Sequence, residues 1–295
     1  MKVVDRVKKN VFLINSYSCE KKIDDIRNLI KTVMANEEYE TVESSYRGEI
    51  TEVVKKLENS TVFSVGGDGT LLEVINGAAK TDNDIFVVPA GTGNDFCRVL
   101  TNEKDYKKVL SDYRSYVVKS VDCGKAGDSF FANIASVGYD AEIVKNSMKF
   151  RKIPVLKKIS YIASLLYTVF TFKPIRPRLE IDGKTYEKPL LLAAFANGEY
   201  YGGGIHIAPT AKIDDGYLDV YLCDAVSRIA LIFILPKLLN GSHIKDKHVQ
   251  IKKAKEIKLS SEKPLLLNLD GELEEITETT ISVVENGARF YCKDR

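Results

Sequence analysis

The feature that most constrains this chain is a strand, a glycine turn and a helix in immediate succession at residues 61–75. Phe63 and Val65 favour a buried strand, and after Thr70 the apolar residues recur at helical spacing. Three glycines in the four positions 66–69 allow positive φ angles and a close approach of the backbone to a ligand. The amides of such a turn suit an anion. The segment therefore predicts an anion-binding turn between a strand and a helix.

One residue of this turn, Asp68, would repel a phosphate unless a cation lay between them. A magnesium ion held by Asp68, directly or through water, removes the conflict, so the turn indicates a nucleoside triphosphate site. It is not a Walker loop, because the GKS or GKT ending is missing. The ordinary alternative is a structural turn in which Thr70 is the helix N-cap.

A second apolar run, residues 84–89, is followed by a small-residue loop at 90–96 that opens a helix carrying Arg98. Two glycine loops after consecutive strands fall at the same edge of a parallel sheet. This edge lies outside the carboxyl ends of the strands, where open α/β sheets bind ligands. Arg98 is suited to neutralise phosphate charge, with an ion pair on the helix surface as its alternative role.

The motif GGDGT at 66–70, followed by PAGTGNDF at 89–96, resembles the catalytic domain of diacylglycerol kinases, sphingosine kinases and soluble bacterial lipid kinases. NAD kinases share the first motif but lack the second. The NPxSG motif of the family is only partly present, with Ser16 and Cys19 at two of its positions. The resemblance assigns to the nucleotide Asn15, Ser44, Gly66, Gly67, Asp68, Gly69, Thr70, Leu71, Thr92, Asn94 and Arg98.

Composition excludes several other classes. The chain has 295 residues, of which 44% are hydrophobic and 28% charged, as in an ordinary globular protein. A net charge of +2 does not indicate a nucleic-acid partner. The five cysteines have no metal-ligand spacing, which favours reduced thiols in a cytoplasm. The sequence shows no signal peptide, and its apolar runs are too short to span a bilayer.

The order of the elements predicts two domains. Residues 1–120 alternate strands, among them 11–14 and 39–43, with helices such as 20–34 and 48–57, which indicates a parallel, helix-flanked sheet. Residues 121–295 are rich in strand signals. Asp-Gly pairs at 182–183, 215–216 and 270–271 predict hairpins, so we expect an antiparallel, sandwich-like domain. The active site is expected in a cleft between the domains. The sequence leaves open whether the last residues return to the first domain.

Two acidic turns lie in the second half of the chain. In residues 265–272 an apolar strand ends in Asp270, Gly271 and Glu272. The resemblance makes Glu272 the general base for the acceptor hydroxyl, with Asp270 supporting it and Asp68 organising the metal. In residues 211–220 it implies a structural magnesium ion held by the Asp215 side chain and the carbonyls of Lys212 and Tyr217. Each turn has a plain hairpin as its alternative.

One helical insert interrupts the strand pattern. Residues 149–158 are basic and residues 159–170 are apolar and aromatic, a combination that suits an anionic membrane surface. The alternative is a helix packed on the sheet with solvated lysines. Residues 229–239 raise the same question.

These observations predict a cytoplasmic, ATP- and Mg²⁺-dependent lipid kinase that associates transiently with membranes. Diacylglycerol is the favoured acceptor, giving phosphatidic acid. A sphingoid base, phosphatidylglycerol or a soluble NAD-like acceptor are alternatives, and a non-catalytic nucleotide- or lipid-binding regulator is the alternative from another class. A homodimer is left open.

Overall fold

The structure is a computed structural model that describes residues 8–153 and 159–294. The chain divides into two compact units. The first comprises Met1–Cys123 and Glu285–Arg295, and the second comprises Gly124–Val284. The final residues, whose place the sequence left open, therefore belong to the first unit. Each unit is described by itself below.

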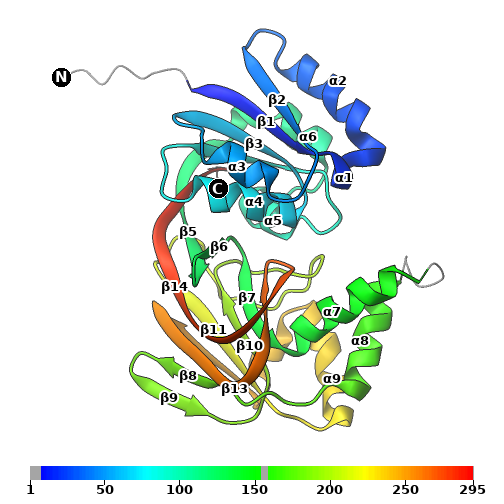
Figure 1. The fold of residues 1–295 in the computed structure, drawn as a ribbon, viewed down its shortest axis with the longest axis vertical. Coiled ribbons are helices and arrows are strands. Elements are labelled where there is room, and N and C mark those ends of the chain that lie inside the picture. Colours follow the sequence, from blue (N-terminus) through cyan, green and yellow to red (C-terminus); the bar gives the residue numbers. More distant parts are fainter. Residues whose placement is uncertain (1–7, 154–158, 295) are drawn as a thin grey trace. The chain divides into compact units, whose positions relative to one another are not determined.

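The first unit is built on a parallel sheet. Its strands are β1 (Lys9–Asn15), β2 (Tyr39–Ser44), β3 (Ser60–Gly66) and β4 (Asp84–Pro89), in the spatial order β2-β1-β3-β4. The last part of β14 (Glu272–Cys292) adds a further parallel strand beside β4, with Phe290 opposite Ile85 (Figure 1). Strands β3 and β4 are buried along their whole length, as expected for a sheet covered on both faces.

Helices follow most of these strands. They are α1 (Ser16–Cys19), η1 (Glu20–Lys22), α2 (Ile23–Val33), α3 (Glu49–Val54), α4 (Asp68–Ala78), α5 (Asp95–Thr101), α6 (Tyr106–Ser111) and η2 (Tyr113–Ser115). An aromatic stack joins the sheet to this layer: the rings of Phe12 and Phe63 lie 4.0 Å apart, and Phe63 meets Tyr113 edge to face. The order of elements confirms the α/β architecture predicted for the first half of the chain.

The second unit is mainly antiparallel. Its strands are β6 (Ser129–Phe131), β7 (Ile134–Gly138), β8 (Arg178–Ile181), β9 (Lys184–Glu187), β10 (Leu190–Ala196), β11 (Leu218–Asp224), β12 (Val249–Ala254), β13 (Glu256–Leu269) and the first part of β14. The order is β12-β11-β10-β7-β13-β14, and each neighbouring pair is antiparallel. Strand β5 (Val117–Ala126) enters this unit and pairs with β6. The sandwich-like β-rich prediction is confirmed.

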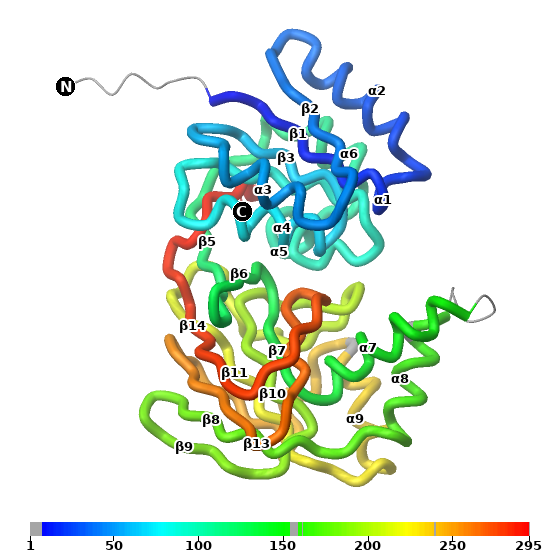
Figure 2. The backbone as a smooth tube through the Cα atoms, in the orientation of Figure 1, coloured from blue at the N-terminus to red at the C-terminus, as the bar shows by residue number. Residues whose placement is uncertain are grey.

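Three longer helices belong to this unit: α7 (Tyr139–Arg151), α8 (Ser160–Thr171) and α9 (Arg228–Leu239), followed by the short helix η4 (Ser242–Lys245). Helices α7 and α8 form a hairpin (Figure 2). The sequence marked only residues 149–170 and 229–239 as helical here, so α7 is longer than expected. Its buried face includes Asp140, Asn146 and Ser147, and these polar residues hide the helical pattern.

Two of the three expected hairpins are present. Asp182-Gly183 joins β8 to β9, and Asp270-Gly271 joins β13 to β14; both residues of each pair have positive φ, as a type I′ turn requires. The prediction of a hairpin at Asp215-Gly216 was wrong. This pair lies in the long connection between β10 and β11, whose strands are themselves antiparallel partners. Gly216 has a φ of 74°, so the pair makes a turn within that connection.

Candidate active site

The carboxyl ends of the four parallel strands bring the predicted nucleotide residues into one row. Asn15 at the end of β1 lies opposite Ser44 at the end of β2, and Gly66 at the end of β3 lies opposite Pro89 at the end of β4. Residues far apart in sequence thus meet at one edge of one sheet, where α/β sheets bind ligands. This row is the frame of the candidate nucleotide site.

The first glycine loop leads directly into α4. Helix α4 begins at Asp68 with Gly67 as its N-cap, so the alternative that made Thr70 the cap is wrong. Thr70 is buried and packs down on Gly66, where an added Cβ would lie 2.1 Å from the Thr70 hydroxyl. The amides of Thr70 and Leu71 donate to the Gly67 carbonyl, which leaves the amides before them at the start of α4 without an intrahelical carbonyl. Since Gly69 at this end is exposed, the loop offers a cradle for an anion.

The second glycine loop is bound to the first by its backbone. The amides of Ala90 and Gly91 both donate to the carbonyl of Gly66, each at 2.9 Å. The two loops approach so closely that a Cβ on Gly91 would lie 2.4 Å from the Cα of Gly67. Only glycine fits at Gly91 without displacing backbone. The two motifs therefore form one composite loop.

Asn94 shapes this second loop from within. Its φ of 54° is left-handed, and its side chain accepts from the Gly91 amide at 3.1 Å and donates to the Gly91 carbonyl at 3.0 Å. The side chain is also buried. The described contacts of Asn94 therefore hold the loop in its conformation, which positions the exposed Thr92 and its neighbour Gly93.

Asp68 joins the two loops through its side chain. Its Oδ1 accepts a hydrogen bond from the backbone amide of Asp95 at 2.8 Å, and its Oδ2 faces Gly93, where a Cβ would lie 2.6 Å away. Burial raises the pKa of Asp68, and hydrogen bonds from the amides at the start of α5 oppose that rise. The sequence predicted a metal-organising carboxylate here, and the structure adds a tie between the loops.

Other predicted nucleotide residues have structural partners as well. Asn15 caps α1 by accepting from the Ser18 amide at 3.0 Å, and the Ser44 hydroxyl donates to the Ile14 carbonyl at 3.5 Å. Leu71 is buried in α4. Arg98 pairs with Asp95 at 3.7 Å, as in the alternative named from the sequence, but the pair is largely buried and does not lie on the helix surface.

Lys22 is a further cation at this edge of the sheet. Its Nζ donates to the carbonyl of Ala90 at 3.2 Å and lies 5.4 Å from the centre of the Tyr106 ring. Its ammonium group therefore sits on the second glycine loop. A basic residue at the start of a helix gives no signal of this in the sequence, because the contact spans 68 positions.

The acidic turn of the second unit separates its two carboxylates. Asp270 accepts hydrogen bonds from the amides of Ala132, Asn133 and Ile134 at 2.7 to 3.2 Å. This carboxylate anchors the start of β7 to the turn. Glu272 is the first residue of β14, opposite Leu269, and is only partly buried. Glu272 is therefore the acid of this turn with an accessible side chain, and Asp270 is a positioning residue.

A buried polar network continues from this turn. The Asn268 side chain accepts from the Gly271 amide at 2.9 Å and donates to Asp140 Oδ2 at 3.2 Å. Ser136 also donates to the same Asp140 oxygen. Burial raises the pKa of Asp140. Sequence analysis missed this network, because a serine, an aspartate and an asparagine scattered over 132 positions carry no local pattern.

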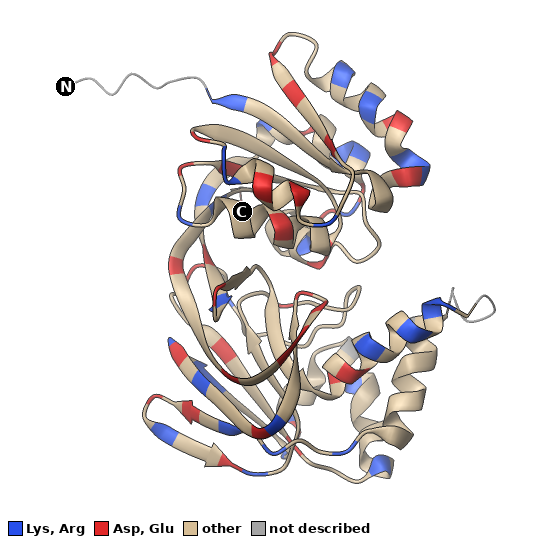
Figure 3. Ribbon diagram, viewed as in Figure 1, with Lys and Arg blue, Asp and Glu red and all other residues tan. Residues whose placement is uncertain are grey.

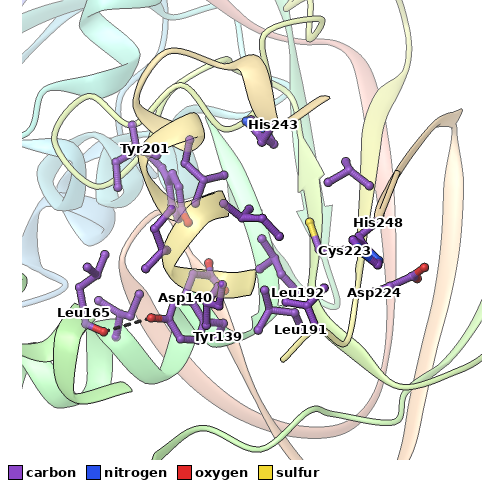
Figure 4. A pocket seen from close by; sticks show the side chains of 18 residues that line it. Tyr139, Asp140, Leu165, Leu191, Leu192, Tyr201, Cys223, Asp224, His243 and His248 are labelled. Carbon is purple, nitrogen blue, oxygen red and sulfur yellow. Dashed lines mark hydrogen bonds between the residues drawn. The ribbon is translucent and has the colours of Figure 1, made fainter. Parts of the chain in front are cut away.

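Asp140 also borders an apolar pocket (Figure 4). Its wall includes Leu191 and Leu192 of β10 and Leu165 of α8, together with leucine and isoleucine residues of α9. The Tyr139 hydroxyl closes one side by donating to the Leu165 carbonyl at 3.0 Å. A pocket with this lining suits a hydrocarbon chain.

The predicted metal turn lies between β10 and β11. Asp215 Oδ1 accepts from the Tyr217 amide at 3.2 Å, its Oδ2 pairs with Lys253, and the Lys212 side chain is exposed. Lys253 also lies 3.6 Å from Asp219. The Lys253 ammonium group therefore occupies one oxygen of the carboxylate that the resemblance assigned to magnesium. Within residues 8–153 and 159–294, no cluster of three or more His, Cys, Asp or Glu side chains has metal-binding geometry.

Comparison with known families agrees with this geometry. The model of the diacylglycerol kinase catalytic domain matches residues 9–126, and that of the YegS C-terminal NAD kinase beta sandwich-like domain matches residues 133–288. A protein named diacylglycerol kinase from Staphylococcus saprophyticus is 30% identical over 226 residues, which cover 75% of this chain and 74% of the relative. The chain belongs to the diacylglycerol kinase family.

A second relative and a solved structure are also similar to this chain. The Bacillus subtilis protein named diacylglycerol kinase is 29% identical over 250 residues, covering 83% of this chain and 82% of its own. The crystal structure of a diacylglycerol kinase from Bacillus anthracis has the same fold, with a TM-score of 0.77, 23% identity and 97% coverage of both chains. Family membership makes this protein a lipid kinase.

No helix among the described residues of this family member is long and apolar enough to cross a membrane. Its five cysteines are all buried, and none of them forms a disulfide.

Proposed function

We propose that this lipid kinase transfers the γ-phosphate of ATP to the hydroxyl group of diacylglycerol, giving phosphatidic acid and ADP. The observation that carries the proposal is the apolar pocket, because Asp140 joins it through the buried network to the turn that bears Glu272. An acceptor with hydrocarbon chains fits such a lining, and a soluble acceptor such as NAD does not.

The nucleotide is assigned to the composite glycine loop of the first unit. The start of α4 at the exposed Gly69 suits the phosphate groups of ATP, because helix N-termini bind anions. Asp68 would hold Mg²⁺ through water while it keeps its bond to the Asp95 amide. The ion would supply positive charge against the phosphate oxygens. Lys22 and Arg98 add two cations near this end of the sheet.

In the proposed reaction Glu272 accepts the proton of the acceptor hydroxyl. The hydroxyl oxygen forms a bond to the γ-phosphorus as the bond between that phosphorus and the β–γ bridging oxygen breaks, and ADP leaves. A carboxylate is a far weaker base than an alkoxide, so Glu272 acts chiefly by orienting the hydroxyl and accepts the proton late. Asp270 is excluded from this role because three amides already occupy its carboxylate.

The test is transfer of labelled γ-phosphate from ATP to diacylglycerol in mixed micelles with magnesium. Wild type should label the lipid, and Glu272→Gln should lower kcat by at least 100-fold, within the usual contribution of a general base of about 10²–10⁴. The matched control is Glu274→Gln, two residues along the same strand and exposed, which should keep wild-type activity. If Glu272→Gln stays fully active, the base is another group.

The acceptor is identified by comparing several candidate substrates in the same assay. Sphingoid bases, phosphatidylglycerol and NAD are offered under the same conditions. A faster reaction with any of these would replace diacylglycerol as the substrate. Nucleotide binding without transfer to any acceptor would instead make the chain a binding protein.

A further inference from the structure

We propose that the outer faces of α8 and α9 form a docking surface for an anionic phospholipid bilayer. This inference goes beyond the phosphate-transfer reaction, and it can fail or succeed independently of that reaction. It rests on three observations in the second unit: the exposure of large apolar side chains, the distribution of charge, and the position of the pocket.

Apolar side chains are exposed in stripes on both helices. On α8, Ile162, Leu166 and Phe170 follow one another at four-residue spacing, with exposed fractions of 62%, 56% and 62%. On α9, Ile229 and Phe233 repeat that spacing, with exposed fractions of 71% and 70%. Helices α8 and α9 are in contact with each other. Large exposed apolar patches of this kind mark interaction surfaces.

Basic residues are concentrated in the part of the chain next to α8. Residues 143–179 contain nine lysines and arginines and no acidic residue, although the whole chain has a net charge of only +2. Neither α8 nor α9 contains an acidic residue (Figure 3). At the end of α7 that leads towards α8, Lys149, Arg151 and Lys152 are exposed, and none forms an ion pair with a described residue. Lys157 and Lys158 of the basic segment lie outside the described residues.

Exposed apolar side chains next to basic side chains indicate which kind of partner binds this surface. Apolar side chains enter the boundary between headgroups and acyl chains, and basic side chains at the same level are attracted to anionic headgroups. An interface with a second copy of this chain would face the same positive charge and be repelled. Charge complementarity therefore favours an anionic bilayer.

The same helices form walls of the apolar pocket. Leu165 of α8 and Leu231 and Ile234 of α9 point to the pocket, whereas Leu166, Ile229 and Phe233 are outside its lining. Each helix thus has one apolar face towards the pocket and another towards solvent. A bilayer against the outer faces would bring lipid next to the helices that wall the pocket.

Flotation with lipid vesicles tests this surface without any phosphate transfer. Wild type should bind vesicles containing phosphatidylglycerol and show little binding to pure phosphatidylcholine vesicles, and added salt should weaken the binding. The double variant Phe170→Ser/Phe233→Ser should lower the partition coefficient at least tenfold. Its matched control is Tyr46→Ser, which removes an exposed aromatic side chain from the first unit and should bind as wild type.

Charge is tested in the same assay. The triple variant Lys149→Gln/Arg151→Gln/Lys152→Gln should reduce binding by about fivefold for each charge removed. The control Lys31→Gln/Lys55→Gln/Lys56→Gln changes the net charge equally at exposed sites of the first unit and should bind as wild type. Both docking variants should keep the wild-type Tm, since every substituted side chain is exposed.

Three outcomes would overturn the proposal: no binding of wild type to anionic vesicles, equal binding to neutral ones, or unchanged binding by both docking variants. A wild-type dimer that becomes monomeric in the phenylalanine variant, without vesicle binding, would make this surface a self-association interface instead. Activity towards a monomeric short-chain diacylglycerol separates the two proposals. Docking variants should retain that activity, whereas its absence in wild type would contradict only the proposed reaction.

Discussion

Asp68 Oδ1 accepts a hydrogen bond from the backbone amide of Asp95 at 2.8 Å, so a carboxylate of the first glycine loop caps the helix that the second loop opens. These two residues are 27 positions apart, and the motifs that contain them form one structural element. The residue that we propose to organise the metal therefore also organises the loops, and variants of Asp68 report on both roles.

Replacing Asp68 should affect stability as well as activity. Asp68→Ala should lower the free energy of unfolding by about 1–3 kcal/mol, since it leaves the amides of α5 without their acceptor. Asp68→Asn keeps one acceptor oxygen and should cost less. Urea denaturation measures both. Equal stability of Asp68→Ala and wild type would show that the bond to Asp95 has no structural importance.

The same residue predicts a pH dependence. Burial raises the pKa of Asp68 in the folded state, so its contribution to stability is full below the unfolded pKa and is lost as the pH rises through the folded pKa. The stability of wild type relative to Asp68→Asn should therefore fall from acidic to neutral pH. Urea titrations at several pH values measure the difference in unfolding free energy between wild type and Asp68→Asn. A difference that stays constant or rises with pH would contradict the prediction.

The close approach of the two loops makes Gly91 irreplaceable. In Gly91→Ala the new methyl group would meet the backbone of Gly67 at 2.4 Å, and the loops must separate. We expect Gly91→Ala to have an at least tenfold lower affinity for nucleotide and a lower Tm than wild type. Gly67→Ala is the matched comparison, because its methyl group would lie 3.3 Å from Gly91 Cα and needs only a small adjustment. Titration with a fluorescent ATP analogue measures the affinity of both variants. A lower affinity in Gly67→Ala than in Gly91→Ala would contradict the prediction.

Asp270 and Glu272 should separate stability from catalysis. Asp270→Asn removes the charge that three amides bind and should cost about 1.5–3 kcal/mol of unfolding free energy. Asp182→Asn is a matched control, since Asp182 has the same φ of 48° in the other hairpin turn. Its cost should stay within about 0.5 kcal/mol. Glu272→Gln should leave the unfolding curve unchanged, and a large shift there would assign Glu272 a structural role.

The network behind the acidic turn should behave as a unit. Asp140 and Asn268 share a buried hydrogen bond of 3.2 Å, so alanine substitutions at the two positions should not be additive. A double-mutant cycle on unfolding free energies should give a coupling of about 1 kcal/mol or more. Additivity within about 0.3 kcal/mol would mean that the two side chains are independent.

The thiols of the native protein should be unreactive. Burial raises the pKa of Cys97 and of Cys223 to about 12, so the thiolate fraction at pH 8 is about 10⁻⁴ for each. Labelling with a thiol reagent at pH 8 should be slow until denaturant is added, when all five cysteines react. Fast labelling of Cys97 in the native state would show that α5 opens readily.

The sequence by itself determined the order of elements and the family. Local chemistry did this: glycine turns after apolar runs, and Asp-Gly pairs between strands, act over a few residues and leave their pattern in the chain. The hairpins at Asp182 and Asp270 follow directly from that chemistry. The pair at Asp215 does not follow this rule, because it makes a turn inside the long connection between β10 and β11 and does not join the two strands directly.

Only the tertiary structure decided how the side chains divide their roles. Asp270 and Glu272 look alike in the sequence, yet strand pairing brings three amides of residues 132–134 to Asp270 and leaves Glu272 partly exposed. Lys22 reaches the second glycine loop, and Asp140 joins Asn268, across 68 and 128 positions. Contacts of this kind depend on which backbone donors and acceptors the sheet brings together. They therefore leave no local pattern in the sequence, and the fold alone decides them.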